Sequence, residues 1–510
     1  MEIINSIFSW IFRKRMHQIE LFLRYPHEVQ QELLMNLLQT AKNTEWGKLY
    51  GFEDIKNYPQ FVQRIPVQDY IGFKKDIIRL KHGEQNILWP TEIKWFAKSS
   101  GTTAGKSKFI PVSREALEEC HFKAGKDMLA LYFNNVPASR LFSGRHLVIG
   151  GSHYVNQFSS DSYYGDLSSI LIENLPFWVN MRKTPGKTVA LLDEWEQKIE
   201  KMALETSKKN VTNISGVPSW TLILLRHILE ITGKKYITEV WPNLELFVHG
   251  GVAFTPYADQ FHAIIPNEKM NYMESYNASE GFFAIQDFLQ KDELLLMLDY
   301  GIFYEFIPMD DISSGKTIPL DEVKTGQNYA MVITTNAGLW RYQIGDTVTF
   351  TSLNPYRIKV SGRIKHFINA FGEELIVDNA ERALKIACEK TNALIKEYTA
   401  GPMYMGKEHT GRHEWLIEFE KEPDSLEYFT EILDNALKSI NSDYEAKRYK
   451  DLVLQKPLVH ALPANTFYSW LEQKGKLGGQ NKVPRLSNDR TYPDEILSLI
   501  GKENKKITSS

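Results

Sequence analysis

Residues 98–108 combine glycine, hydroxyl and lysine residues in a pattern that suits an anionic ligand. The segment reads Lys-Ser-Ser-Gly-Thr-Thr-Ala-Gly-Lys-Ser-Lys. Gly101 and Gly105 allow the backbone to bend and to approach a phosphate closely. The side chains that could bind the phosphate oxygens are Ser99, Ser100, Thr102, Thr103, Lys98, Lys106 and Lys108. This composition predicts a loop that binds a nucleotide polyphosphate.

Gly105, Lys106 and Ser107 resemble the end of a Walker A loop, but the spacing excludes that motif. A Walker A loop has four residues between its first glycine and the Gly-Lys pair. Only Thr102, Thr103 and Ala104 stand between Gly101 and Gly105. The segment is therefore a phosphate loop of another type or, as the alternative, a solvated turn without a ligand.

Two expected strands end in groups that could act on a nucleotide. Residues 247–256 contain the end of a strand and the double-glycine turn Gly250-Gly251, where a flat base could pack against backbone. Residues 276–281 end the next strand with an aromatic ring, a hydroxyl and the carboxylate of Glu280.

Two later segments add a carboxylate and a cation. Residues 340–346 place Asp346 at a tight turn, and Arg363 follows within the segment 362–365. A lone carboxylate is usually solvated surface, so the interpretation depends on the whole set of segments occurring in this order.

The ordered set resembles the adenylate-forming superfamily, which contains acyl-CoA ligases, luciferases and the adenylation domains of peptide synthetases. Three stretches are most similar to one branch, the auxin-responsive family of acyl acid amido synthetases: Ser-Ser-Gly-Thr-Thr-Ala-Gly, Tyr-Asn-Ala-Ser-Glu-Gly and Arg-Tyr-Gln-Ile-Gly-Asp. The resemblance runs from about Phe22 to Arg485. It implies ATP and Mg²⁺ as cofactors, with a small carboxylic acid and an amino acid as substrates. The short, lysine-rich chain favours a bacterial member of the family.

The resemblance also implies roles for the matched residues. Those matched to the nucleotide are Ser99, Ser100, Thr102 and Thr103 for the phosphates, Gly250 and Gly251 for the adenine-side turn, and Tyr276 and Ala278 beside the base. Glu280 matches the carboxylate that holds Mg²⁺, a hard oxygen ligand for a hard cation. Asp346 matches the acid that accepts hydrogen bonds from the ribose hydroxyls, with Arg363 assisting it.

A second catalytic candidate lies near the C-terminus. The segment Gly479–Arg485 resembles the one that carries the mobile lysine of the superfamily, and Lys482 is the matching lysine. A cation on the α-phosphate would stabilise the charge that develops as pyrophosphate leaves.

The implied reaction adenylates the acid and then transfers the acyl group to an amine, with release of AMP. An acyl-CoA ligase, which would use coenzyme A as the acceptor, remains an alternative. A non-catalytic nucleotide- or ligand-binding protein on the same fold is a second one. Neither the acid nor the acceptor is identified by the sequence.

Apolar runs with β-branched residues alternate with helical stretches, which predicts an α/β architecture with large sheets. The expected strands are 146–149, 244–248, 272–276, 294–298, 329–334, 394–400 and 413–419, and the expected helices 114–133, 193–208, 219–231, 256–264, 377–390 and 425–439. We expect residues 1–361 to form an N-terminal α/β adenylation domain whose β-sheets are flanked by helices. Residues 362–510 should form a small, mobile α+β lid domain that carries Lys482.

Composition bounds the partners and the compartment. The formal charge of −3 gives no general attraction to nucleic acid or to an anionic membrane. Two cysteines cannot form a disulfide framework. We therefore expect a cytoplasmic monomer that binds small molecules, without nucleic acid and without stable membrane insertion.

Two features concern the acyl substrate. Lys123, on the expected helix 114–133, could meet a second acidic group of the substrate, although a surface lysine is the default interpretation. The aromatic residues that could line an acyl pocket, with core packing as the alternative, are Phe158, Tyr163, Tyr164, Phe177 and Trp178.

Overall fold

The computed structural model describes residues 15–507 apart from 104–105, 151–154, 160, 193–194, 252–253, 255–256, 365–366, 369, 372, 374, 406–409, 442–443, 446–447, 449–453, 476–481 and 488. The chain forms two compact units. Unit 1 comprises Met1–Phe254, Gln260–Ile344 and Val348–Lys359, and unit 2 comprises Thr255–Asp259, Gly345–Thr347 and Val360–Ser510. The predicted roles of residues 1–361 and 362–510 stay predictions.

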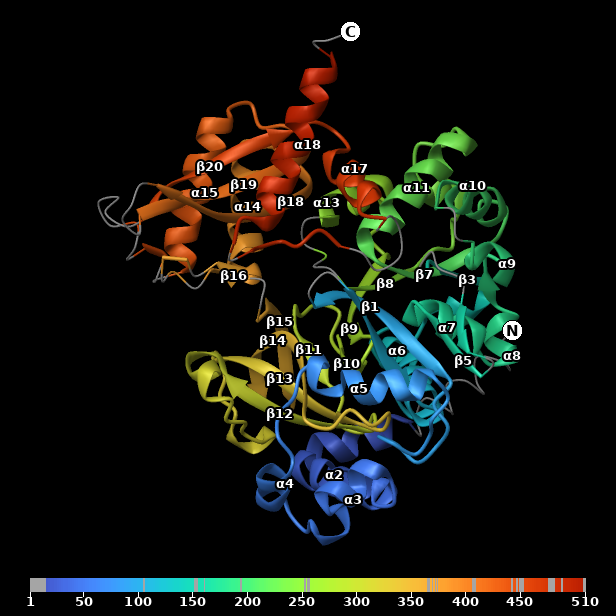
Figure 1. Ribbon diagram of the computed structural model, residues 1–510. Helices are drawn as coiled ribbons and strands as arrows, with labels where there is room; N and C mark the ends of the chain where they lie inside the picture. Colours follow the sequence, from blue (N-terminus) through green and yellow to red (C-terminus); the bar gives the residue numbers. More distant parts are fainter. Residues whose placement is uncertain are drawn as a thin grey trace. The chain divides into compact units, whose positions relative to one another are not determined.

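A large mixed sheet runs through unit 1 (Figure 1). In sheet order its strands are β12 (Ile302–Pro308), β13 (Asn328–Thr335), β14 (Tyr342–Leu353), β15 (Tyr356–Arg363), β11 (Leu294–Leu296), β10 (Gly281–Ile285), β9 (Asn271–Ala278), β8 (Leu246–Gly250), β7 (Val211–Gly216), β3 (Arg145–Val148) and β6 (Lys183–Thr184). From β6 to β9 neighbouring strands are parallel. β9, β10, β11 and β15 pair antiparallel, as do β12 and β13.

A smaller sheet carries the glycine- and hydroxyl-rich segment. Its order is β2 (Lys106–Val112), β1 (Trp95–Thr103), β5 (Ser162–Gly165) and β4 (Asn156–Ser159). β1 and β2 form an antiparallel hairpin, while β1 and β5 are parallel.

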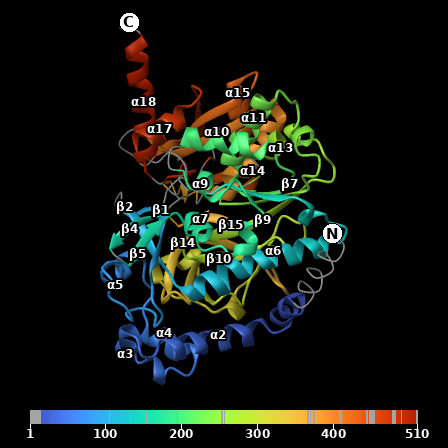
Figure 2. The same ribbon diagram turned by 90° about the vertical axis from the view of Figure 1, so that its right-hand side faces the viewer.

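The helices of unit 1 flank these sheets. They are α2 (Pro26–Ala41), α3 (Glu45–Tyr50), α4 (Tyr58–Arg64), α5 (Tyr70–Lys81), α6 (Phe122–Asn135), α7 (Leu167–Glu173), α8 (Phe177–Asn180), α9 (Lys187–Ala190), α10 (Trp195–Thr206), α11 (Pro218–Thr232), α12 (Ile237–Val240) and α13 (Ala258–Ile264). α2 begins with Pro26, which fits the first helical position because the N–H there has no hydrogen-bond acceptor within the helix. One face of α2 is buried and carries Leu34, Leu37, Leu38 and Ala41. A π-helical turn, Ala116–His121, packs against β10, and α6 continues from it across the sheet (Figure 2).

Unit 2 is built on a three-stranded sheet in the order β18 (Leu394–Met405), β19 (Thr410–Lys421) and β20 (Leu454–Leu462). Its other elements are β16 (Phe367–Ile368), β17 (Leu375–Ile376), α14 (Val377–Thr391), α15 (Leu426–Ile440), α17 (Thr466–Gln473) and α18 (Thr491–Ile507). Side chains alternate across β19, because successive strand residues point to opposite faces. Trp415 joins the core beneath α14 and α15, whereas Leu416 joins a second core with Phe467 and Trp470 of α17.

The predicted α/β class is confirmed. The expected strand 272–276 becomes Asn271–Ala278 and the expected helix 377–390 becomes Val377–Thr391. The expected helix 114–133 contains the π-helical turn before α6, which periodicity alone does not reveal. In the described part of the chain, no helix combines the length and apolar character that a membrane span requires.

Candidate functional site

The predicted phosphate loop is the tip of the β1–β2 hairpin. Ser99 pairs with Lys108 and Thr103 pairs with Lys106, and the register shifts between Ser99 and Thr102. Such a bulge bends the strand and re-aims its side chains, as is common beside functional sites. The backbone of Ser99, Ser100, Thr102 and Thr103 belongs to β1; their side chains and Gly105 lie outside the described part, so their binding role stays a prediction.

Helix α5 holds this hairpin from one side. The Phe109 N–H donates to the Tyr70 hydroxyl at 3.0 Å. The Lys81 ammonium lies 4.2 Å from the ring centre of Phe109 and 3.8 Å from that of Phe158. Tyr164 stacks on Phe158 with ring centres 4.0 Å apart. Phe158 and Tyr164 thus pack against the core at the hairpin, as the core-packing alternative expected. Phe177, in contrast, is 81% exposed, so core packing was wrong for this residue.

Only glycine fits at the end of β8. A Cβ at Gly250 would lie 2.4 Å from the carbonyl oxygen of Ser275 on the neighbouring strand. The next residue, Gly251, has φ of 82°, in the left-handed region that side chains disfavour. The double glycine is therefore required by the backbone itself, and it leaves a turn without side chains where a flat base could approach.

Glu280 lies in the turn between β9 and β10, half-buried, next to the start of β14. The Tyr342 hydroxyl donates to its Oε1 at 3.5 Å. Ala278 ends β9 and pairs with Gly281. The ring of Tyr276 is buried and packs against Phe283, with ring centres 4.9 Å apart. The roles of Tyr276 and Ala278 beside the base stay predictions.

Arg341 is a positioning residue that sequence reasoning missed. It has φ of 48°, a conformation that is rare for residues other than glycine. Its guanidinium forms a buried ion pair with Glu305, with the shortest contact at 2.9 Å, and donates to Thr317 Oγ1 at 2.6 Å. Arg341 lies inside the motif that contains Asp346. Its partner Glu305 is 36 positions away in the sequence, and no local pattern connects the two residues.

Asp346 and Arg363 are brought together in unit 2. Arg363 Nε donates to Asp346 Oδ1 at 2.6 Å. Asp346 is buried, while 41% of the Arg363 side chain is exposed. The Ile364 N–H donates to the Gly345 carbonyl at 2.8 Å, and Gly345 and Gly362 both have positive φ. The two glycines allow the turns that bring the carboxylate and the guanidinium face to face.

Lys482 lies within electrostatic range of this pair. The protein atoms around its ammonium lower the pKa of Lys482 to about 8; Arg363 acts in the same direction and Asp346 opposes it. The residue still contacts water, since it is exposed by area. Asp346, Arg363 and Lys482 thus form one electrostatic group.

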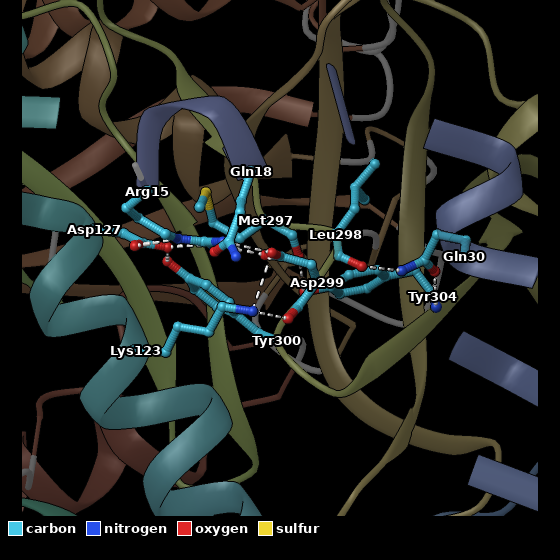
Figure 3. A network of polar contacts seen from close by, with 10 residues as sticks. All are labelled: Arg15, Gln18, Gln30, Lys123, Asp127, Met297, Leu298, Asp299, Tyr300 and Tyr304. Atoms are coloured by element: carbon cyan, nitrogen blue, oxygen red, sulfur yellow. Dashed lines mark hydrogen bonds and ion pairs between the residues drawn. The ribbon is translucent and has the colours of Figure 1, made fainter. Parts of the chain in front are cut away.

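Lys123 is paired with an acidic residue of the protein itself. Its ammonium lies 3.0 Å from Asp299 Oδ2 and donates to the Asp299 carbonyl at 2.7 Å. Arg15 bridges Asp299 and the buried Asp127, and the Tyr300 hydroxyl donates to Asp127 at 2.7 Å (Figure 3). The network joins α6 to the segment after β11 and to the N-terminal helix, so Lys123 is a structural ion-pair partner.

The charged groups can do the chemistry of nucleotide activation. The described residues contain no cluster of three or more His, Cys, Asp or Glu side chains suited to a metal. Mg²⁺ keeps several waters and takes further oxygens from substrate phosphates, so one protein carboxylate, such as that of Glu280, could suffice to hold it.

Models of the GH3 family match the chain in three parts. The GH3 family N-terminal domain matches residues 15–270, the central domain 295–363 and the C-terminal domain 378–491. One curated relative is the indole-3-acetic acid-amido synthetase GH3.4 of Arabidopsis thaliana, 26% identical over 409 residues, which are 67% of this chain and 67% of the relative.

Solved structures share the fold. The GH3.15 acyl acid amido synthetase superposes with a TM-score of 0.76 at 16% identity, covering 92% of this chain and 93% of the other. The 2-hydroxyisobutyryl-CoA ligase, in its postadenylation state with 2-HIB-AMP, superposes with a TM-score of 0.59 at 13% identity, covering 94% and 92%.

The close approach at Gly250 predicts a stability defect. In Gly250→Ala the new methyl group must displace the Ser275 backbone, and we expect a loss of roughly 1–3 kcal/mol of unfolding free energy. Gly125→Ala is the matched control, because Gly125 lies in helix α6 with open space around its Cβ position. That variant should be neutral or slightly stabilised. Urea unfolding measures both; equal midpoints for the two variants would contradict the expectation.

Proposed function

The chain belongs to the GH3 family, and we propose that it is an ATP-dependent acyl acid amido synthetase. The observation that carries the proposal is the group formed by Asp346, Arg363 and Lys482. A carboxylate suited to ribose hydroxyls thus lies within electrostatic range of a cation suited to a phosphate. The amido synthetases among the relatives and the adenylate-bound ligase of the same fold support this choice.

The first step forms the acyl-adenylate. An oxygen of the substrate carboxylate attacks the α-phosphorus of ATP, and the bond to the bridging oxygen of the β-phosphate breaks as pyrophosphate leaves. The β1–β2 hairpin would bind the phosphates and Glu280 would hold Mg²⁺, which neutralises phosphate charge. Lys482 would stabilise the negative charge that develops on the leaving pyrophosphate. No protein nucleophile is needed, because the adenylate is itself the activated acyl group.

The second step forms the amide. The nitrogen of an amino acid attacks the acyl carbon, the bond to the phosphate oxygen breaks with AMP taking the electron pair, and the amine proton passes to solvent. The protein contributes mainly by holding the reactants in place and excluding water that would hydrolyse the adenylate.

An acyl-CoA ligase is the second candidate, because the 2-hydroxyisobutyryl-CoA ligase has the same fold. The two activities share the first step and differ only in the nucleophile of the second. The remaining alternative is a protein that binds a nucleotide without catalysis.

A product assay separates these candidates. Pyrophosphate and AMP are measured from MgATP across a panel of carboxylic acids that includes indole-3-acetate, each with pooled amino acids, with coenzyme A or alone. We expect acid-dependent pyrophosphate, and AMP release with an amide product only when amino acids are present. AMP release driven by coenzyme A alone would indicate the thioester-forming activity. ATP binding without pyrophosphate from any acid would support the non-catalytic alternative.

The contact between Tyr342 and Glu280 predicts a graded dependence on Mg²⁺. Glu280→Gln removes the charge that would hold the metal and should raise the Mg²⁺ concentration for half-maximal pyrophosphate release by about tenfold or more. Tyr342→Phe removes only the hydroxyl that orients the carboxylate and should raise it by roughly three- to tenfold. Tyr329→Phe, which removes a hydroxyl that donates to Gln327, is the control and should leave it unchanged. Identical Mg²⁺ curves for all three would refute the role of Glu280.

The lowered pKa of Lys482 predicts the pH dependence of the first step. Only the ammonium form stabilises the phosphate charge, so the adenylation rate should fall as pH rises through about 8. Lys482→Arg keeps a positive charge throughout this range, so its lower rate should stay flat with pH. Single-turnover pyrophosphate release at subsaturating MgATP, where the pH profile reports the free enzyme, is measured from pH 6 to 10. A wild-type rate that does not decline up to pH 10 would exclude a required Lys482 ammonium.

A further inference from the structure

The stretch that follows Lys482 is fixed to β18. The Thr399 hydroxyl donates to the Pro484 carbonyl at 2.6 Å, and the Ala400 N–H donates to the Arg485 carbonyl at 2.9 Å. The Ser487 N–H in turn donates to the Ala400 carbonyl at 2.9 Å. Residues 484–487 therefore run alongside β18 as a short parallel addition, and Lys482 lies just before it.

Arg485 makes the side-chain part of this attachment. Its guanidinium forms an ion pair with Glu397 and donates to the Tyr257 hydroxyl at 3.3 Å. It also lies over the Tyr398 ring, 4.7 Å from the ring centre. Only 13% of the Arg485 side chain is exposed. A planar guanidinium that pairs and stacks at once has one favoured orientation, which a flexible lysine would not reproduce.

A second carboxyl group faces the same guanidinium. Burial raises the pKa of Glu381 on α14 to about 7, and Arg485 opposes the rise. Val483, between the fixed stretch and Lys482, is itself buried in the core with Leu416 and Phe467. The backbone on the C-terminal side of Lys482 is thus held by a side chain in the core, by hydrogen bonds and by an ion pair.

We propose that Arg485 is a positioning residue: with Thr399 it holds the stretch after Lys482 so that the Lys482 ammonium stays within range of Asp346 and Arg363. The proposal rests on the proposed function for its catalytic consequence, but the positioning itself can be measured without a substrate. Arg485 touches neither nucleotide nor acid in this scheme and acts only through Lys482.

Chemical labelling measures the positioning directly. The full-length protein is treated at pH 8 with trinitrobenzenesulfonate, which reacts with neutral amines, and labelling of Lys482 is followed by peptide mass spectrometry. When the stretch is released in Arg485→Gln, the Lys482 pKa should return toward the ordinary lysine value near 10.4, and labelling should slow by about fivefold or more. An unchanged labelling rate would overturn the proposal.

Two further variants guard against a general effect of destabilisation. Arg490→Gln removes a comparable arginine of unit 2, which pairs with Glu414 at 2.7 Å and donates to the Pro402 carbonyl on β18 at 3.0 Å. It should leave Lys482 labelling unchanged; equal slowing in both arginine variants would overturn the proposal. Thr399→Val keeps the volume of the buried threonine, loses only its hydrogen bond to Pro484, and should slow labelling by about two- to fivefold.

The half-reactions then test the catalytic consequence with the acid that the panel identifies. Arg485→Gln should slow pyrophosphate release about 10- to 100-fold and leave amide formation from supplied acyl-adenylate within about twofold. The double variant Lys482→Ala/Arg485→Gln should be no slower than Lys482→Ala, because the arginine acts through the lysine. Multiplying effects would overturn the proposal. A fully active Lys482→Ala would instead refute the role of Lys482 in the proposed function, while labelling still decides the positioning.

Discussion

The buried ion pair between Arg341 and Glu305 sets the geometry of unit 1 around the candidate site. The Arg341 guanidinium contacts more than Glu305 and Thr317. It also donates to the carbonyls of Val62 and Ile65, at the end of α4, at 3.2 and 2.5 Å. One side chain therefore joins β12, the segment before β13 and α4 to the start of β14. Losing either partner would leave a charge buried without compensation, at a cost of about 3–5 kcal/mol.

This ion pair also explains why the chain accepts a left-handed residue just before β14. The Arg341 N–H donates to Thr334 Oγ1 at 2.9 Å, and its carbonyl accepts from the Gln68 N–H at 3.0 Å. Strained backbone persists only where its surroundings determine it fully, and it is concentrated at functional sites. The strain here turns the chain so that Tyr342 reaches Glu280 and the strand leads directly to Asp346.

The sequence predicted the fold class and the candidate site residues whose charged side chains suit nucleotide chemistry. It did not predict the residues that support the site through contacts between distant parts of the chain. Asp346, Arg363 and Lys482 were predicted because a carboxylate or a cation in an ordered set of motifs is chemically specific. The structure pairs Asp346 with Arg363 and has Lys482 within electrostatic range of both, while their roles stay predictions. Arg341 stood within the same motif, but its role depends on Glu305, and no periodicity links residues on different strands. The ion pair of Lys123 was not predicted for the same reason, because Asp299 lies far from it in sequence.

The group in unit 2 has one more consequence for how a nucleotide would bind. Asp346 already accepts a hydrogen bond from Arg363 at 2.6 Å, so a ribose hydroxyl would share this carboxylate with a guanidinium. Two cations, Arg363 and Lys482, then lie near one acidic side chain, which leaves a net positive charge. Such an excess favours a polyanion over a neutral ligand. The charges of this group therefore suit the polyphosphate ligand of the proposed function.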